Sequence, residues 1–143
     1  METQNLLNEY QHYNHSVGTS MFHLEWCTKY RYKMFGKEDQ RALITACIRR
    51  AASLHGIKII EIQVMPEHVH VAVQISMTMC AAKALQILKG ISAKLFFKIN
   101  YKARWRYPKG HLWSKGKFAS SLGFVQIDVA RNYIRSQVEH HSA

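Results

Sequence analysis

Two histidines separated by one valine are the first residues of this sequence whose types and spacing could do chemistry. His68 and His70 lie in "MPEHVHVAV", residues 65–73, which alternates as a β-strand does. Residues two apart on a strand point to the same face, so both imidazoles share one face and the valines share the other. Neutral imidazole is a common metal ligand, so the pair could bind one cation. Two exposed histidines on a tolerant sheet would give the same pattern.

A possible third ligand and a possible nucleophile lie near the end of the chain. Tyr133 and Gln137 are four residues apart, so on a helix they are neighbours on one face, along an apolar stripe. A glutamine on the apolar side of a helix needs a partner, and a metal ion would satisfy its carbonyl oxygen. The alternative for Tyr133 is a core residue with its hydroxyl at the rim, and the spacing alone leaves both open.

The surrounding pattern predicts the elements that would position these residues. We expect strands at 20–32, 57–65, 68–75 and 117–125, and helices at 37–55, 81–98 and 128–141. Strands 57–65 and 68–75 should form an antiparallel hairpin. This order predicts an α+β fold with a single antiparallel β-sheet and helices on one face, ferredoxin-like or RNA-recognition-motif-like, with the other face available for function. We expect one domain over residues 1–143, with a polar arm at 1–18.

The charge distribution predicts a polyanionic partner. The chain has 20 Lys and Arg against 9 Asp and Glu, and no acidic residue occurs between His68 and Ile127. Such a surface can neutralise the phosphates of a nucleic acid. We predict nucleic-acid contacts from this block and from the end of the first strand, at Lys29, Arg31, Lys33, Lys94, Lys98, Arg104, Arg106, Lys115 and Lys117.

Other classes of protein find little support. The three cysteines have no Cys-x-x-Cys spacing, so neither a disulfide framework nor a zinc knuckle is expected. No segment resembles a signal peptide or reaches the apolar length of a membrane span. We therefore expect a soluble cytoplasmic protein.

Five segments, in this order along the chain, resemble one known family. They are "FHLEWCTKYRYKMF", "VMPEHVHVAV", "LKGISAKLFF", "LWSKGKFASSLG" and "YIRSQ", and together they extend over most of the chain, from about Phe22 to Gln137. The sequence resembles the HUH single-tyrosine transposases of small insertion sequences, the TnpA-like group, which move as single-stranded DNA.

The resemblance implies a complete active site and an activity. His68 and His70 would bind a divalent metal ion, Mg or Mn, with Gln137 as third ligand and Tyr133 as nucleophile. The enzyme would cleave and rejoin single-stranded DNA at element ends through a 5′-phosphotyrosine intermediate. It would recognise hairpins at these ends through its basic surface. The resemblance also implies a prokaryotic cell and a homodimer in which the tyrosine helix of one subunit completes the site of the other. Two imidazole ligands should favour Mn in vitro.

Three other functions fit part of the pattern. A domesticated relative would use the same chemistry on repeat palindromes in the genome. A non-enzymatic RNA-recognition-like module would bind nucleic acid by stacking bases on strand aromatics, for which Phe22 and Trp26 are the candidates. A cytosolic metal-binding regulator would explain the histidines but not the basic block.

Overall fold

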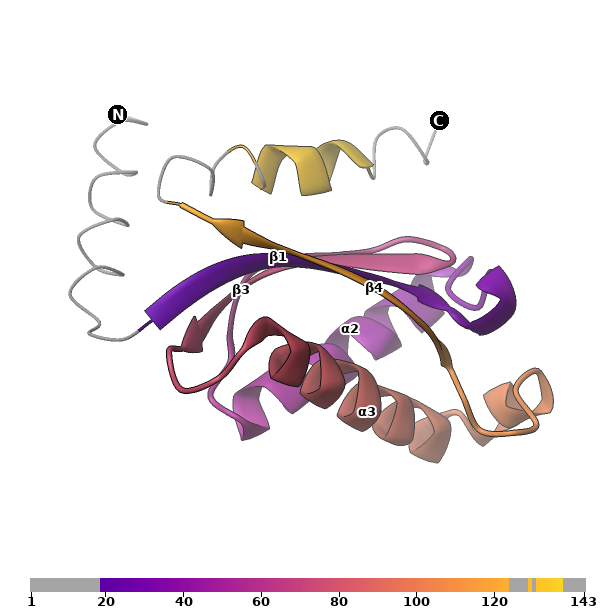
Figure 1. Cartoon of the computed structure of the whole chain (residues 1–143). Helices are drawn as coiled ribbons and strands as arrows, with labels where there is room; N and C mark the ends of the chain where they lie inside the picture. The colour runs from indigo at the N-terminus through magenta and orange to yellow at the C-terminus, as the bar shows by residue number, and fades with distance from the viewer. Residues whose placement is uncertain (1–18, 124–128, 130, 138–143) are drawn as a thin grey trace.

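Four antiparallel strands form one sheet in the computed structural model, which describes residues 19–123, 129 and 131–137. The strands are β1 (Thr19–Thr28), β2 (Lys58–Val64), β3 (His68–Ser76) and β4 (Trp113–Leu122), in the spatial order β2-β3-β1-β4. Helices α2 (Glu38–Leu54) and α3 (Ala81–Ile99) pack against one face (Figure 1). The predicted α+β class, the antiparallel sheet and the ferredoxin-like order are confirmed.

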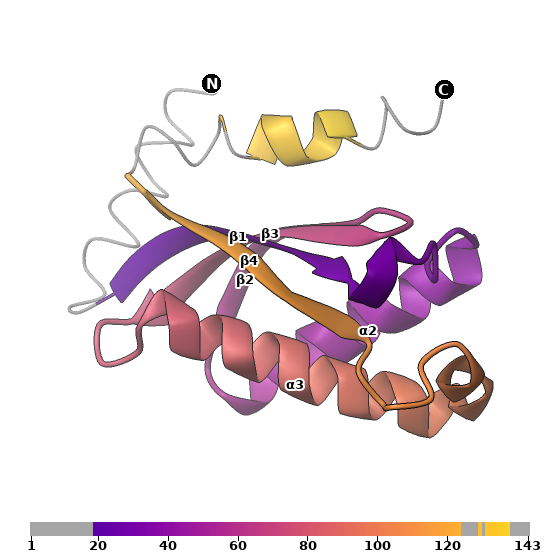
Figure 2. The same cartoon turned by 45° about the vertical axis from the view of Figure 1, so that its right-hand side comes forward.

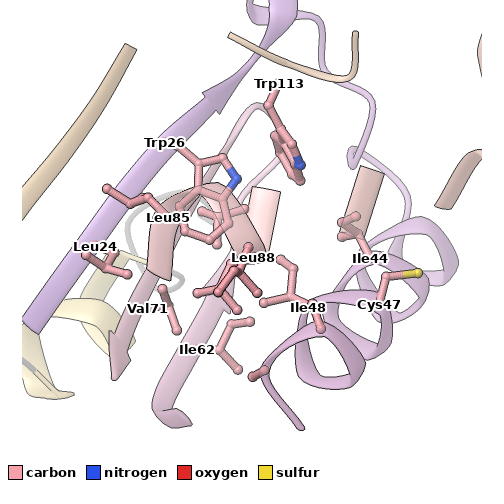
Figure 3. Packing of buried hydrophobic residues seen from close by; sticks show 14 of the residues in the cluster. Leu24, Trp26, Ile44, Cys47, Ile48, Ile62, Val71, Leu85, Leu88 and Trp113 are labelled. Atoms are coloured by element: carbon pink, nitrogen blue, oxygen red, sulfur yellow. The ribbon is translucent and has the colours of Figure 1, made fainter. Parts of the chain in front are cut away.

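The core lies between the sheet and these two helices. Alternate residues of β1 enter it, with Leu24 and Trp26 buried, because successive strand residues point to opposite faces. Val71 of β3, Ile48 of α2 and Leu88 of α3 belong to one buried cluster there, which Figure 3 shows together with Trp26. The face of β3 that carries the valines is therefore the core face, as the alternation predicted.

The first strand is shorter than the predicted range of 20–32. It ends at Thr28, whose hydroxyl donates to the Tyr32 carbonyl at 2.7 Å, and the chain then turns through a short 3-10 helix, η1 (Lys29–Arg31). Tyr30 and Arg31 have positive φ angles of 62° and 54° there, which end the extended conformation.

The last strand begins at Trp113, four residues before the predicted start at residue 117. The backbone N–H of Lys29 donates to the Leu112 carbonyl at 2.8 Å, and Thr28 pairs with Trp113. These long-range contacts extend the strand, although most of β4 is exposed and shows no buried alternation. A second 3-10 helix, η2 (Tyr101–Trp105), precedes it. Residues 124 and 125 of the predicted strand lie outside the described residues.

A C-terminal helical segment, residues 131–137, lies across the sheet from α2 and α3 (Figures 1 and 2). Ile134 is fully buried, and the Arg135 guanidinium donates to the Glu61 carboxylate of β2 at 2.9 Å. The segment therefore rests on the sheet face that carries the histidines. The predicted arm at residues 1–18 and the ends of the predicted helix 128–141 lie outside the described residues. No helix among the described residues is long and apolar enough to cross a membrane.

Candidate active site and nucleic-acid surface

The two predicted ligand histidines lie side by side on β3. The rings of His68 and His70 have centroids 4.8 Å apart and an interplanar angle of 81°. His70 is only 1% exposed, because this sheet face carries the C-terminal segment and is not open at that point. His68, at the start of the strand, is partly exposed.

Strand pairing adds two side chains from β1 that the sequence analysis did not identify. His70 pairs with Glu25, and its Nδ1 lies 3.5 Å from the Glu25 Oε2 and 3.4 Å from the His23 Nε2. One donor atom from each of His23, Glu25 and His70 can be chosen so that all three lie within 4.8 Å of one another. Among the described residues, this cluster has the chemistry of a divalent-cation site.

A sequence signal for these two residues existed. His23 and Glu25 alternate with buried Leu24 just as His68 and His70 alternate with Val69, but only the β1–β3 register shows that the two pairs meet. Burial lowers the pKa of the His23 imidazole, against a smaller opposing effect of the Glu25 carboxylate. His23 is therefore held in its neutral form, which is the form that binds metals.

The C-terminal segment brings the predicted nucleophile to the histidines. The Tyr133 ring lies 5.7 Å from the His70 ring and 6.1 Å from the His23 ring, between centroids, in edge-on contact. Tyr133 is 48% exposed, so it contacts the site and is still accessible to a substrate. Gln137 lies one helical turn further along and is partly buried. In this chain, the segment contacts its own sheet.

The predicted nucleic-acid residues divide between several surfaces. Lys94, Lys98, Arg104 and Lys115 line a groove of about 820 Å³ between α3, η2 and β4. Arg31 and Lys117 line a smaller pocket of about 410 Å³ that also includes Glu25. The remaining three lie around η1 and η2. Lys33 and Arg106 line a third pocket, and the Lys29 ammonium lies 5.4 Å from the centre of the Tyr30 ring.

The groove combines charge with aromatic surface. Phe97, Tyr101 and Trp113 are among its lining residues, and Lys89 donates to the Ser114 carbonyl at its wall. By contrast, a base-stacking sheet would need two strand aromatics on its open face. Here both pack in or against the core. Trp26 is 1% exposed in the core, and Phe22 packs against it. The RNA-recognition-like alternative thus loses both of its candidate stacking residues.

Comparison with known proteins shows the family and agrees with the fold. The family model described as "Transposase IS200 like" matches residues 16–137, and the chain belongs to that family. The resemblance to small insertion-sequence transposases is thereby confirmed.

Individual relatives give the same result. The ISDra2 transposase TnpA of Deinococcus radiodurans is 30% identical over 116 residues, covering 81% of this chain and 82% of the relative. The transposase for insertion sequence element IS200 of Salmonella typhimurium is 22% identical over 125 residues, covering 87% of this chain and 81% of the relative.

Two solved structures share the fold. A crystal structure of a candidate transposase from Deinococcus radiodurans has a TM-score of 0.68 at 23% identity, and covers 85% of this chain and 92% of its own. A REP-associated tyrosine transposase bound to a REP hairpin has a TM-score of 0.64 at 12% identity, with 87% of this chain and 70% of that one covered.

Proposed function

We propose that this transposase cleaves and rejoins single-stranded DNA at insertion-sequence ends, with Tyr133 as the nucleophile. The observation that carries this proposal is the contact of the half-exposed Tyr133 ring with the buried His70, at 5.7 Å between centroids. A half-exposed tyrosine beside a cluster of metal-binding side chains has the position that a nucleophile in metal-assisted phosphoryl transfer requires. Membership of a transposase family supports a DNA-processing reaction at this place.

The chemistry of the donor set fits a divalent cation. We propose His68, His70 and Gln137 as ligands of Mg or Mn, and the histidine rings are 4.8 Å apart, close enough to share an ion. When bound, such an ion supplies Lewis-acid stabilisation of the charge that develops on the scissile phosphate. His70 is only 1% exposed, so packing holds its ring in place before any ion binds.

The proposed covalent step follows from the position of Tyr133. Its phenolic oxygen attacks phosphorus, the new P–O bond gives a 5′-phosphotyrosine, and the bond to the leaving 3′ oxygen breaks. The proton lost from the phenol is balanced by the proton gained at the released 3′-hydroxyl. A second 3′-hydroxyl reverses the step, so joining needs no nucleotide cofactor. A phenol with a pKa of about 10 needs local stabilisation of its anion at neutral pH.

The basic surfaces would hold the DNA. Arg31 and Lys117, which line one pocket with Glu25, would bind backbone phosphates there. The larger groove, with Lys94, Lys98 and Arg104, would hold a hairpin stem or its flanking strand. Hairpin recognition is supported by the REP hairpin held by one structural relative. We further propose a homodimer acting in the cytoplasm of a prokaryotic cell, in which the active sites become shared by exchange of the segment that here contacts its own sheet.

A covalent-adduct assay tests the proposed reaction. The protein is incubated with single-stranded DNA from the ends of its own element and Mn, and a protein–DNA adduct resistant to denaturant is expected. Tyr133→Phe should abolish the adduct, whereas Tyr107→Phe, an equally conservative change at a buried tyrosine that lines none of the proposed DNA-binding surfaces, should retain it. An adduct of undiminished yield in Tyr133→Phe would contradict the proposal.

A second candidate function is the same chemistry on genomic repeat palindromes. The observation that favours it is the fold shared with the REP-associated transposase. The two candidate functions are separated by an adduct assay with matched amounts of element-end DNA and of palindromic repeats from the same genome. The true substrate gives the higher adduct yield.

A further inference from the structure

Each of the two histidines proposed to bind metal has a carboxylate at the same ring nitrogen. The His68 Nδ1 lies 2.8 Å from the Glu67 Oε1, and the His70 Nδ1 lies 3.5 Å from the Glu25 Oε2. The two carboxylates come from different places, since Glu67 precedes β3 and Glu25 is the cross-strand neighbour of His70 on β1. The common feature is therefore the Nδ1 edge of both rings.

A carboxylate at Nδ1 selects one tautomer of a neutral imidazole. An ionised carboxylate only accepts hydrogen bonds, so it favours a proton on the nitrogen that faces it. A neutral imidazole carries one N–H, and the lone pair is then on Nε2. The second neighbour of His70 is compatible with this tautomer, because the His23 Nε2, 3.4 Å from Nδ1, can accept from it.

We propose that Glu67 and Glu25 are positioning residues that hold His68 and His70 as Nδ1–H tautomers and so direct both Nε2 atoms toward the divalent ion. Outer carboxylates of this kind orient metal-binding histidines and raise the basicity of the ligand nitrogen. The proposal rests on the proposed function in one respect, that the ion binds this histidine pair.

The tautomers are measured directly by long-range proton–nitrogen NMR of the full chain labelled with ¹⁵N-histidine, without metal or DNA. His68 and His70 should both show a protonated Nδ1 and an unprotonated Nε2. Glu67→Ala should remove this preference at His68 alone, and Glu25→Ala should weaken it at His70 alone, where the His23 Nε2 remains as an acceptor. Glu67→Gln, which retains an acceptor oxygen, should restore it in part. Thermal unfolding of each variant confirms that it is folded.

Manganese affinity provides the second measurement, by calorimetric titration without DNA. Glu67→Ala and Glu25→Ala should each weaken Mn binding by about 10- to 100-fold. Glu61→Ala is the matched control, because Glu61 is a carboxylate on the adjacent strand that pairs with Arg135. It should leave the affinity within about two- to threefold of the parent, as expected for loss of a screened, partly exposed charge.

The outcomes separate this inference from the proposed function. Nε2–H tautomers in the parent protein, or Mn affinities unchanged by both substitutions, would overturn it. If Glu25→Ala abolishes Mn binding while His68→Ala has no effect, the ion is held directly by His23, Glu25 and His70 and the positioning role of Glu25 is wrong. Failure of the adduct assay with intact Mn binding would instead count against Tyr133 chemistry alone.

Discussion

Ile134 should be the residue that docks the tyrosine-bearing segment on the sheet. It is fully buried, and it lies on residues 131–137, next to Tyr133. Replacing a buried isoleucine by alanine costs about 2–5 kcal/mol, through lost transfer free energy and the cavity left behind. Because about 1.4 kcal/mol is a factor of ten, a cost of about 3 kcal/mol shifts the docking equilibrium roughly 100-fold.

The ion pair between Arg135 and Glu61 offers a control, because it should contribute little free energy to docking. The Arg135 side chain is 62% exposed and its partner Glu61 is 18% exposed, so solvent screens the pair. Such pairs contribute at most about 1 kcal/mol, which is less than about a fivefold change in docking. Arg135→Ala removes this contact and leaves the buried side chain in place.

Amide hydrogen exchange of the full chain measures the effect. In Ile134→Ala, exchange across residues 131–137 should accelerate strongly, with β1 and β3 nearly unchanged, because the segment opens locally. Arg135→Ala should accelerate it only slightly. Two results would refute the view that one buried side chain docks the segment. One is equal acceleration in the two variants, and the other is a loss of protection in β3 of Ile134→Ala as large as that in residues 131–137. The adduct yield should fall in parallel in Ile134→Ala.

Four further substitutions test the framework that supports the site. Burial raises the pKa of Tyr107 to about 12, so the unfolded state loses its phenolic proton first; stability to urea should fall as the pH rises from 10 toward 12, and less so in Tyr107→Phe. Gly90→Ala, inside α3 with open space around it, should stabilise by about 0.5–1 kcal/mol, whereas Gly110→Ala, at a φ of 77°, should destabilise by about 1–2 kcal/mol in the same urea titration. Trp113→Phe removes the buried hydrogen bond to the Ser92 hydroxyl, 3.1 Å long, and should lower the free energy of unfolding by about 1 kcal/mol or more.

Much of the fold followed from local pattern. Alternation in β3 correctly separated the buried valines from the histidines, since strand geometry alone sends neighbouring side chains to opposite faces. Helical periodicity located the ends of α2 and α3 to within one residue. The extent of β4 was wrong at its start, because its residues are mostly exposed and only pairing with β1 and burial of Trp113 define it.

The sequence by itself determined which residue types are available for the chemistry and which strand face carries the two histidines. It could not show what lies opposite them, because cross-strand neighbours depend on register between segments more than forty residues apart. Only the tertiary structure decided that Glu25 and His23 surround His70, and that Tyr133 reaches the same cluster. The physical reason is that hydrogen bonding between β1 and β3, and burial of Ile134, bring these side chains together, and neither is encoded in any one segment.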